Sequence, residues 1–381
     1  MAQLYIQNIQ PGDKTRKDFH FVLFIFKKSA SMKRILKQTV GIDVAQKELV
    51  VQIGRLYEDL STELYAHKCF VNTPKGFISM VQWVLKLTEP TVSIRYVMEA
   101  TGVYHESLAC YLADHGYSVS IILPNRISNY FRTLSVKTIT DKSASEAIAL
   151  FGLERNLEDW RRPKPVFKYL RQLTRERDQL VQERTMIKNQ LHAEKTESDP
   201  NSSTLKRIKQ RIDLLNKQEK VIKEEIATLS KKEKELKAEL VLLCTIPGIG
   251  TLTAATILAE TNGFELVRNK RQLASYAGFD VQEKQSGTSV KGKTRISKKG
   301  NKNLRKAMHL PSLTAIRHDR RFKAIFARLV SKHGIKMKAA VAVQRKLLEL
   351  SYTIFKTQRP YNKNHLQEAQ VAAQKNEMQI V

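Results

Sequence analysis

The stretch Val40 to Gly54, VGIDVAQKELVVQIG, decides the fold of this chain. Apolar and small residues alternate up to Asp43, a β-branched run follows at 49–53, and Lys47 and Glu48 suit a turn between two strands. The pattern predicts a β-hairpin whose first strand carries a carboxylate. A carboxylate is costly to bury unless it is paired, hydrogen-bonded or bound to a cation, so Asp43 is either an exposed edge-strand residue or part of a site.

The next segments predict an α/β arrangement with a mixed sheet. Strands are expected at Glu63–Val71, Ile94–Met98 and Tyr117–Leu123, and helices at Gly76–Leu87 and Gly102–His115. The strand at 94–98 ends in a second acid, Glu99. If the strand order is that of a ribonuclease-H-like fold, Asp43 and Glu99 are neighbours at the centre of the sheet.

A third acid begins a predicted helix. Thr140 and Asp141 stand at the head of a predicted helix through DKSASEAIALFGLE, in which Ile148, Leu150 and Phe151 give an apolar face. Carboxylate oxygens are the ligands that Mg²⁺ prefers. Asp43, Glu99 and Asp141 are therefore candidate metal ligands, and a metal pair held by them can stabilise attack at a phosphodiester.

The charge of the chain indicates a polyanionic partner. A net charge of +29 and a pI near 10 favour nucleic acid over an anionic membrane. The apolar run Phe19–Phe26 is too short to span a bilayer, and residues 1–31 are expected to form a disordered extension. The three cysteines have no metal-ligand spacing, which predicts buried thiols in a reducing, cytoplasmic compartment.

The middle of the chain predicts two long helices. After the linker RRPKP, leucines and isoleucines recur near heptad spacing from Val166 to Leu191 and again from Leu205 to Leu243, with the polar break ESDPNSS between the two series. An antiparallel coiled-coil hairpin is expected. Charged residues interrupt its seam at Arg177, Arg184, Glu219 and Glu233. The hairpin is either a spacer that packs on itself or a surface for self-association into a dimer or tetramer.

The C-terminal part carries two motifs for phosphate binding. In TIPGIGTLTAATILAE, Gly248 and Gly250 lead into a helix whose free N–H groups suit a phosphate, as in a helix-hairpin-helix turn, or else form a simple turn between packed helices. Between Lys291 and Lys306 there is no acid. This segment is either a solvated basic loop or a nucleic-acid contact. The candidate contacts in it are Lys291, Lys293, Arg295, Lys298, Lys299 and Arg305.

Several of these segments together resemble one family. GIDVAQK, EATGVY and TDKSASEAIA look like the three acidic motifs of the DEDD insertion-sequence transposases, and AGF, QSGTSVKGKTRISKKGN and LR match that family's C-terminal motif. The resemblance implies a RuvC-like domain, a C-terminal transposase domain, guidance by a bridge RNA and assembly through the coiled coil. It places the family's catalytic serine on Ser286. Composition alone does not separate Ser286 from Ser289 or Ser297, and Ser before Gly commonly caps a turn.

The sequence departs from the family pattern at one position. The family has a second Asp three residues after the helix Asp, and this chain has Ala144 there. Glu146 is the candidate substitute, although an offset of five residues points it away from Asp141. The alternatives are a weaker site completed by water, or an impaired one.

The charge and the acids predict a nucleic-acid enzyme with Mg²⁺ as cofactor, and the resemblance implies a bacterial DNA recombinase that is guided by a structured RNA, acts at the nucleoid and forms a covalent phosphoserine intermediate. The expected segments are an extension at 1–31, a RuvC-like domain at 32–160, a coiled-coil hairpin at 161–243, a mainly helical transposase domain at 244–360 and a loose tail at 361–381. If the two catalytic domains meet, in one chain or across a dimer, the metal and the serine form a composite site. A metal-dependent structure-specific nuclease and a non-catalytic nucleic-acid-binding protein are the alternatives.

Overall fold

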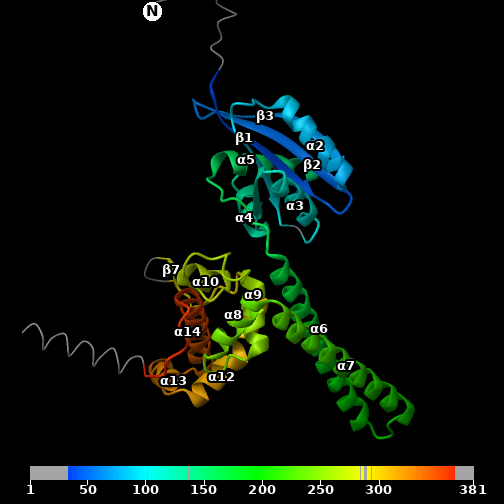
Figure 1. Ribbon diagram of the computed structural model, residues 1–381, viewed down its shortest axis with the longest axis vertical. Helices are drawn as coiled ribbons and strands as arrows, with labels where there is room; N and C mark the ends of the chain where they lie inside the picture. Colours follow the sequence, from blue (N-terminus) through cyan, green and yellow to red (C-terminus); the bar gives the residue numbers. More distant parts are fainter. Residues whose placement is uncertain are drawn as a thin grey trace, which may run out of the picture. The chain divides into compact units, whose positions relative to one another are not determined.

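The computed structural model describes residues 33–364 apart from 101, 135–137, 139, 284, 287–289 and 293. The chain divides into two compact units, residues 1–162 and 163–381, called unit 1 and unit 2 below (Figure 1). The extension expected at 1–31 lies outside the described residues, and so does most of the tail expected at 361–381.

Unit 1 is built on a five-stranded sheet in the order β3-β2-β1-β4-β5. The strands are β1 (Ile35–Val44), β2 (Glu48–Tyr57), β3 (Thr62–Val71), β4 (Ile94–Glu99) and β5 (Ser118–Ile122). The first three form an antiparallel meander, and β4 and β5 continue the sheet parallel to β1. This mixed sheet with β1 at its centre is the ribonuclease-H-like arrangement that the sequence predicts.

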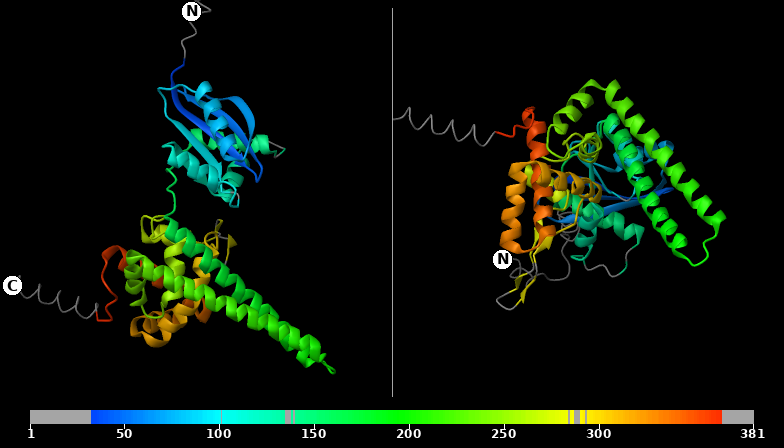
Figure 2. Two further views of the ribbon diagram at one scale, coloured as in Figure 1. Left: turned by 45° about the vertical axis from the view of Figure 1, so that its right-hand side comes forward. Right: turned by 90° about the horizontal axis from the view of Figure 1, so that it is seen from below.

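Two layers of helices cover the sheet (Figure 1, Figure 2). The helices α2 (Pro74–Leu87) and α3 (Glu106–Asp114) pack with side chains such as Ile42 and Met98, whereas α4 (Pro124–Phe131) and α5 (Asp141–Glu154) pack with Val97. Successive strand residues point to opposite faces, so each layer uses alternate positions. The helix α4 was not predicted. Pro124 was expected only to end β5, but it stands in the first turn of α4, where proline is well tolerated.

Two glycines let α5 lie directly on the sheet. A Cβ atom at Gly41 of β1 would stand 2.3 Å from the backbone nitrogen of Ala149, and one at Gly152 of α5 would stand 2.5 Å from the Cγ2 atom of Thr39. Separations this short require something to move. The two glycines therefore fix the distance at which the α5 backbone crosses β1, and with it the position of Asp141.

Unit 2 begins with the two predicted long helices, α6 (Pro165–Thr196) and α7 (Ser202–Lys232), which fold back on each other as a hairpin (Figure 2). Apolar side chains of its seam are buried between the helices: Ile187, Ile208, Ile212 and Leu215. The charged seam residues Arg177 and Arg184 both pair with Glu219, which is 4% exposed. Although burial opposes its ionisation, Lys223 and these two arginines lower the pKa of Glu219 to about 2.

The sequence suggested one continuous helix over the second heptad series, but the structure contains two. The series breaks at Glu233, and α8 (Lys234–Cys244) turns into the body of the unit. The body is mainly helical, as predicted. Its other helices are α9 (Thr251–Thr261), α10 (Lys270–Tyr276), α11 (Lys302–Ala307), α12 (His309–His318), α13 (Arg320–His333) and α14 (Lys336–Thr357).

One core cluster joins the base of the hairpin to this body. It includes Phe167 of α6, Leu258 of α9 and Leu347 of α14. In the part of the chain that the structure describes, no helix is both long and apolar enough to cross a membrane. The prediction that the cysteines are buried is wrong for Cys69, which is exposed in β3, while Cys110 and Cys244 are partly buried.

Candidate active site and nucleic-acid interface

The three predicted acids of unit 1 meet at one edge of the sheet. Asp43 and Glu99 each stand one residue beyond Ile42 and Met98, the last registered pair between the parallel strands β1 and β4. Both acids alternate onto the face that α5 covers, because Gly41 and Val97, two residues before them, contact α5. Asp141 is the first residue of α5, which Thr140 and Ser143 cap. Two strand ends and one helix start therefore bring the carboxylates together.

The electrostatics of Asp43 reflect this convergence. Burial, together with the negative charges of Asp141 and Glu99, raises the pKa of Asp43 to about 6. A hydrogen bond from the backbone N–H of Val44 acts in the opposite direction. Each of these carboxylates makes ionisation of Asp43 more costly. A bound cation would remove that cost.

The donors suit a hard cation such as Mg²⁺, since all three are carboxylates that repel one another. In the described ranges, however, no three His, Cys, Asp or Glu side chains are arranged closely enough to hold a metal ion as they stand. The position where the family has a fourth acid is the partly buried Ala144, one turn along α5 from Asp141. Glu146 is also partly buried. Its role as a substitute ligand stays a prediction.

Ser286 lies in a β-hairpin arm between α10 and α11. The base of this arm pairs β6 (Val281–Gln282) with β9 (Arg295–Ile296), and its outer part pairs β7 (Gln285–Ser286) with β8 (Val290–Lys291). Ser286 is opposite Val290 in the outer pair. The alternative residue Ser289 and the basic residue Lys293 lie outside the described residues.

The third candidate serine has a structural role at the base of the arm. The Ser297 hydroxyl donates to Oδ1 of Asp280 at 2.6 Å, and its backbone N–H donates to the Asp280 carbonyl at 2.8 Å. These contacts close the arm across β6 and β9. They account for Ser297 without a catalytic role.

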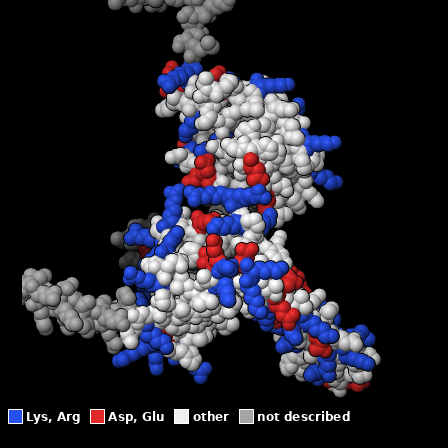
Figure 3. Space-filling model, in the orientation of Figure 1, with Lys and Arg blue, Asp and Glu red and all other residues white. Residues whose placement is uncertain are grey.

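Lys291 belongs to β8 of the arm, and the remaining basic candidates lie at the base of the arm or follow it. Arg295, Lys298 and Lys299 are exposed, whereas Arg305 is partly buried and donates from Nη1 to the Ala277 carbonyl at 2.7 Å. In Figure 3, Lys and Arg side chains are spread over the visible face of unit 2, with acids among those of the hairpin. The exposed positions suit contacts with a phosphate backbone.

The two glycines of the PGIG turn differ in their surroundings. Gly248 has a φ of +85°, and a Cβ atom there would stand 2.3 Å from the carbonyl oxygen of Pro311 in α12. Its backbone thus packs tightly against α12. A Cβ atom at Gly250, the residue before α9, would meet no atom within 4 Å. Gly250 therefore leaves the start of α9 open, whereas Gly248 is required by packing.

A buried carboxylate that the sequence did not single out holds the basic segment in place. Glu260 of α9 is 1% exposed and accepts two hydrogen bonds from the Arg175 guanidinium, at 2.7 and 2.9 Å. It also accepts from the side-chain amides of Asn301 and Asn303, at 2.6 and 3.1 Å. Although burial opposes ionisation, these donors keep the pKa of Glu260 below its ordinary value.

Glu260 thereby ties the hairpin helix α6 to the start of α11. Asn301 also caps α11, accepting from the Leu304 N–H, and its own N–H donates to the Tyr276 carbonyl at 2.7 Å. The signal in the sequence was weak: one acid at the end of the apolar helix segment TLTAATILAET. Its partners are distant along the chain, so spacing alone did not reveal them.

Comparison with known proteins gives relatives over most of the chain. The pilin gene-inverting proteins of Moraxella lacunata and Moraxella bovis are each 28% identical over 338 residues, covering 86% of this chain and 98% of theirs. The solved structure of RuvC from Thermus thermophilus in complex with a Holliday junction substrate aligns with 32% of this chain and 99% of its own, at 12% identity and a TM-score of 0.25.

Two domain families match separate parts of the chain. Residues 40–194 match the family described as Transposase, DEDD_Tnp_IS110, and include the three acids of unit 1. Residues 240–327 match the family described as Transposase IS116/IS110/IS902 and include the serine arm, the basic segment and Glu260. The chain therefore carries two IS110-family transposase domains and is an enzyme of the DNA transposase and recombinase class.

Proposed function

We propose that the chain is the RNA-guided DNA recombinase of an insertion sequence, which cuts and rejoins DNA through a covalent phosphoserine intermediate. The observation that carries the proposal is the convergence of Asp43, Glu99 and Asp141, expressed in the raised pKa of Asp43. It occurs in a chain that also carries a transposase domain containing Ser286. The gene-inverting function named for the Moraxella relatives supports a reaction in which DNA is rejoined after cutting.

In this proposal Asp43, Glu99 and Asp141 would hold Mg²⁺, which supplies electrostatic stabilisation of a phosphate under attack. The chain's contribution is to present carboxylates whose mutual repulsion a cation relieves. The backbone N–H of Val44 and the cap of α5 orient two of these acids. Ala144 leaves the set one carboxylate short of the family pattern.

Ser286 would act as the nucleophile. Its Oγ forms a bond to phosphorus, the bond between phosphorus and one ester oxygen of the DNA breaks, and that oxygen leaves with a proton as a hydroxyl. The energy of the phosphodiester is kept in the serine ester. Attack by a DNA hydroxyl then reverses these steps and frees the serine. Cations of the basic segment offset charge on the phosphate during both transfers.

The proposed partners are inferred from the positive charge of the chain and from the family resemblance. A net charge of +29 supports binding of both DNA and a structured guide RNA. Self-association is proposed through the hairpin, although its seam is buried within the hairpin itself. The residues of α7 that remain available are Leu214 and Val221, which are 56% and 52% exposed one heptad apart. Replacing Leu214 by Lys should lower the oligomer number in sedimentation experiments, and an unchanged number would exclude this surface.

Trapping of the intermediate tests the proposal. Labelled target DNA is incubated with the full chain, its guide RNA and Mg²⁺, then separated by denaturing electrophoresis, and any adduct is mapped by peptide sequencing. The expected result is an adduct on Ser286 that Ser286→Ala abolishes. An adduct that persists in Ser286→Ala, or that maps to Ser289, Ser297 or a tyrosine, would refute the role of Ser286.

The same assay separates the alternatives. Metal-dependent nicking without an adduct would identify a structure-specific nuclease, and retention of DNA with neither nicking nor adduct would identify a binding protein. Ala144 is the observation that favours the binding protein. RNA guidance is tested separately by sequencing the RNA that copurifies with the chain. A discrete structured species from the flanking element is expected, and random cellular RNA would contradict it.

A further inference from the structure

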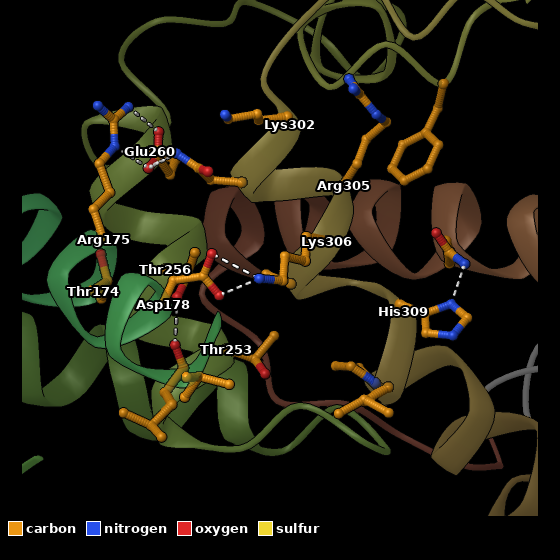
Figure 4. A pocket seen from close by; sticks show the side chains of 18 of the residues that line it. Thr174, Arg175, Asp178, Thr253, Thr256, Glu260, Lys302, Arg305, Lys306 and His309 are labelled. Carbon is orange, nitrogen blue, oxygen red and sulfur yellow. Dashed lines mark hydrogen bonds and ion pairs between the residues drawn. The ribbon is translucent and has the colours of Figure 1, made fainter. Parts of the chain in front are cut away.

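A cavity of about 730 Å³ opens in unit 2 beside the basic segment. Side chains from α6, α9, α11, α12 and α14 line it, together with residues at the base of the serine arm (Figure 4). Ligand sites in proteins have volumes of roughly 300–1,000 Å³, so a group of nucleotide size fits within it. The family motifs draw attention to the arm and not to this cavity.

The charges around the cavity are unbalanced. Two of its cations are neutralised inside it, since Lys306 donates to both carboxylate oxygens of Asp178, at 2.7 and 2.8 Å, and Arg175 pairs with Glu260 (Figure 4). Lys298 and Lys302 also line the cavity, and neither has an acidic partner among the described residues.

Arg305, a further cation of the wall, donates its hydrogen bond to the carbonyl group of Ala277 and not to an acid. These uncompensated cations come from the segment 298–305. Asn301 holds that segment through Glu260 and Tyr276. A fixed group of cations in a partly enclosed site attracts an anion, and phosphate is the anion that Arg and Lys bind together.

A free phosphate ion would contact the cations but not the apolar and neutral polar side chains that form the rest of the cavity wall. Apolar side chains form much of it, among them Leu252, Phe279, Ile296 and Val341. Hydroxyl and amide groups stand among them, including Thr253, Thr256 and Gln344. An anion joined to a flat, largely apolar body with hydrogen-bonding edges matches this lining, and a nucleotide has that chemistry.

We propose that this cavity binds one unstacked nucleotide of a nucleic-acid strand, with its phosphate on Lys298, Lys302 and Arg305 and its base against the apolar wall. The inference rests on the proposed function insofar as unit 2 acts on nucleic acid. It adds a site that holds an unpaired nucleotide beside the arm that carries Ser286. A strand anchored there cannot slide along the basic segment, which fixes the register of the strand relative to the arm.

The experiment compares an intact and an abasic oligonucleotide, for DNA and for RNA. Single-stranded oligonucleotides of DNA and of RNA are labelled at one end, and each is made both intact and with a central abasic residue that keeps the phosphate. Binding to the full chain is measured by fluorescence anisotropy as a function of salt. A base bound on an apolar wall contributes about tenfold in affinity, so the abasic probe should bind the wild type about tenfold more weakly. The strand type that shows this difference identifies the source of the nucleotide.

Three variants locate the effect. Thr253→Trp and Thr256→Trp each place a bulky side chain in the cavity without changing charge, and each should remove the difference between intact and abasic probes while salt-dependent binding persists. Lys302→Gln should lower the slope of log K against log salt by about 0.7, the value for one phosphate contact on a single strand. Lys332→Gln, an exposed lysine of α13 away from the cavity, is the matched control and should leave the abasic difference intact.

The outcomes separate this inference from the proposed function. Equal affinity of intact and abasic probes for the wild type, or a difference that survives both threonine variants, overturns the nucleotide site. The Ser286 adduct is assayed on the same preparations. An adduct without an abasic difference leaves the proposed function standing and removes the site. An abasic difference without an adduct leaves the site and removes the proposed nucleophile.

Discussion

Replacement of Asp43 by Asn should make unit 1 more stable while abolishing strand exchange. In the folded protein, burial and the charges of Asp141 and Glu99 raise the pKa of Asp43 from an ordinary value of 3.8 to about 6. That difference corresponds to at most about 3 kcal/mol of unfolding free energy lost when the group is ionised, and solvent screening at this partly buried group reduces it. Asn has a similar shape and no charge, so the variant should recover up to this amount in metal-free buffer at neutral pH.

The gain must depend on pH in a defined way. Below about pH 4, Asp43 is protonated in both folded and unfolded chains, and its charge contributes nothing. Between pH 4 and 6 the folded chain keeps a proton that the unfolded chain has released, so the stability of the wild type falls as the pH rises. Above about pH 6 the full cost is present. The difference between Asp43→Asn and wild type should therefore appear between pH 4 and 6 and stay level above.

The assay uses the two tryptophans of the chain, Trp83 and Trp160, which both belong to unit 1. Their fluorescence during urea unfolding reports on unit 1 in the intact protein. At pH 8, Mg²⁺ should stabilise the wild type and leave Asp43→Asn unchanged, because a cation bound to the folded state shifts its stability by mass action. A variant less stable than wild type at pH 8, or equally stabilised at pH 4 and pH 8, would refute the reasoning. Retained strand exchange in Asp43→Asn would refute the metal assignment.

Three further predictions concern the other residues. Ala144→Asp should raise Mg²⁺ affinity or recombination if a ligand is missing, and calorimetric titration showing no change would indicate that the site is already complete. Joint replacement of Lys298, Lys299 and Arg305 by Gln should weaken nucleic-acid binding. The slope of log K against log salt should fall by about one for each lost contact with duplex DNA, and an unaltered slope would show that this segment is a solvated loop. Glu260→Gln should destabilise unit 2 by about 2 kcal/mol, because it removes charge from a buried hydrogen-bonded group. Circular dichroism during unfolding should detect this loss, whereas tryptophan fluorescence should not, because both tryptophans belong to unit 1.

The fold of unit 1 could be predicted because its signals are local. Alternation of apolar residues marks each strand, and the short connections leave few strand orders that place Asp43 beside Glu99. Asp141 could be proposed from its place at the head of a predicted helix, but the close contact of Gly41 with α5, which sets its position, became visible only in three dimensions. The helix α4 was missed because Pro124 signals a strand end and a helix start equally well.

Unit 2 was harder to predict for a physical reason. Its decisive contacts join residues far apart in the sequence, as Arg175 does with Glu260 and Asp178 with Lys306. Periodicity can identify a helix face, but it cannot say which distant helix that face meets. The charged seam positions illustrate this limit. They were interpreted as interruptions of a zipper, whereas Arg177 and Glu219 satisfy each other across it.

The Arg175–Glu260–Asn301 network connects the hairpin directly to the arm that carries Ser286. Arg175 belongs to the first third of α6, and Asn301 lies where the arm returns to the body. If a second protein copy or bound nucleic acid displaces the hairpin at Arg175, the hydrogen bonds of Glu260 provide a direct path by which the displacement reaches the root of the arm. Glu260 is thus the residue through which the position of the hairpin is coupled to the position of the arm.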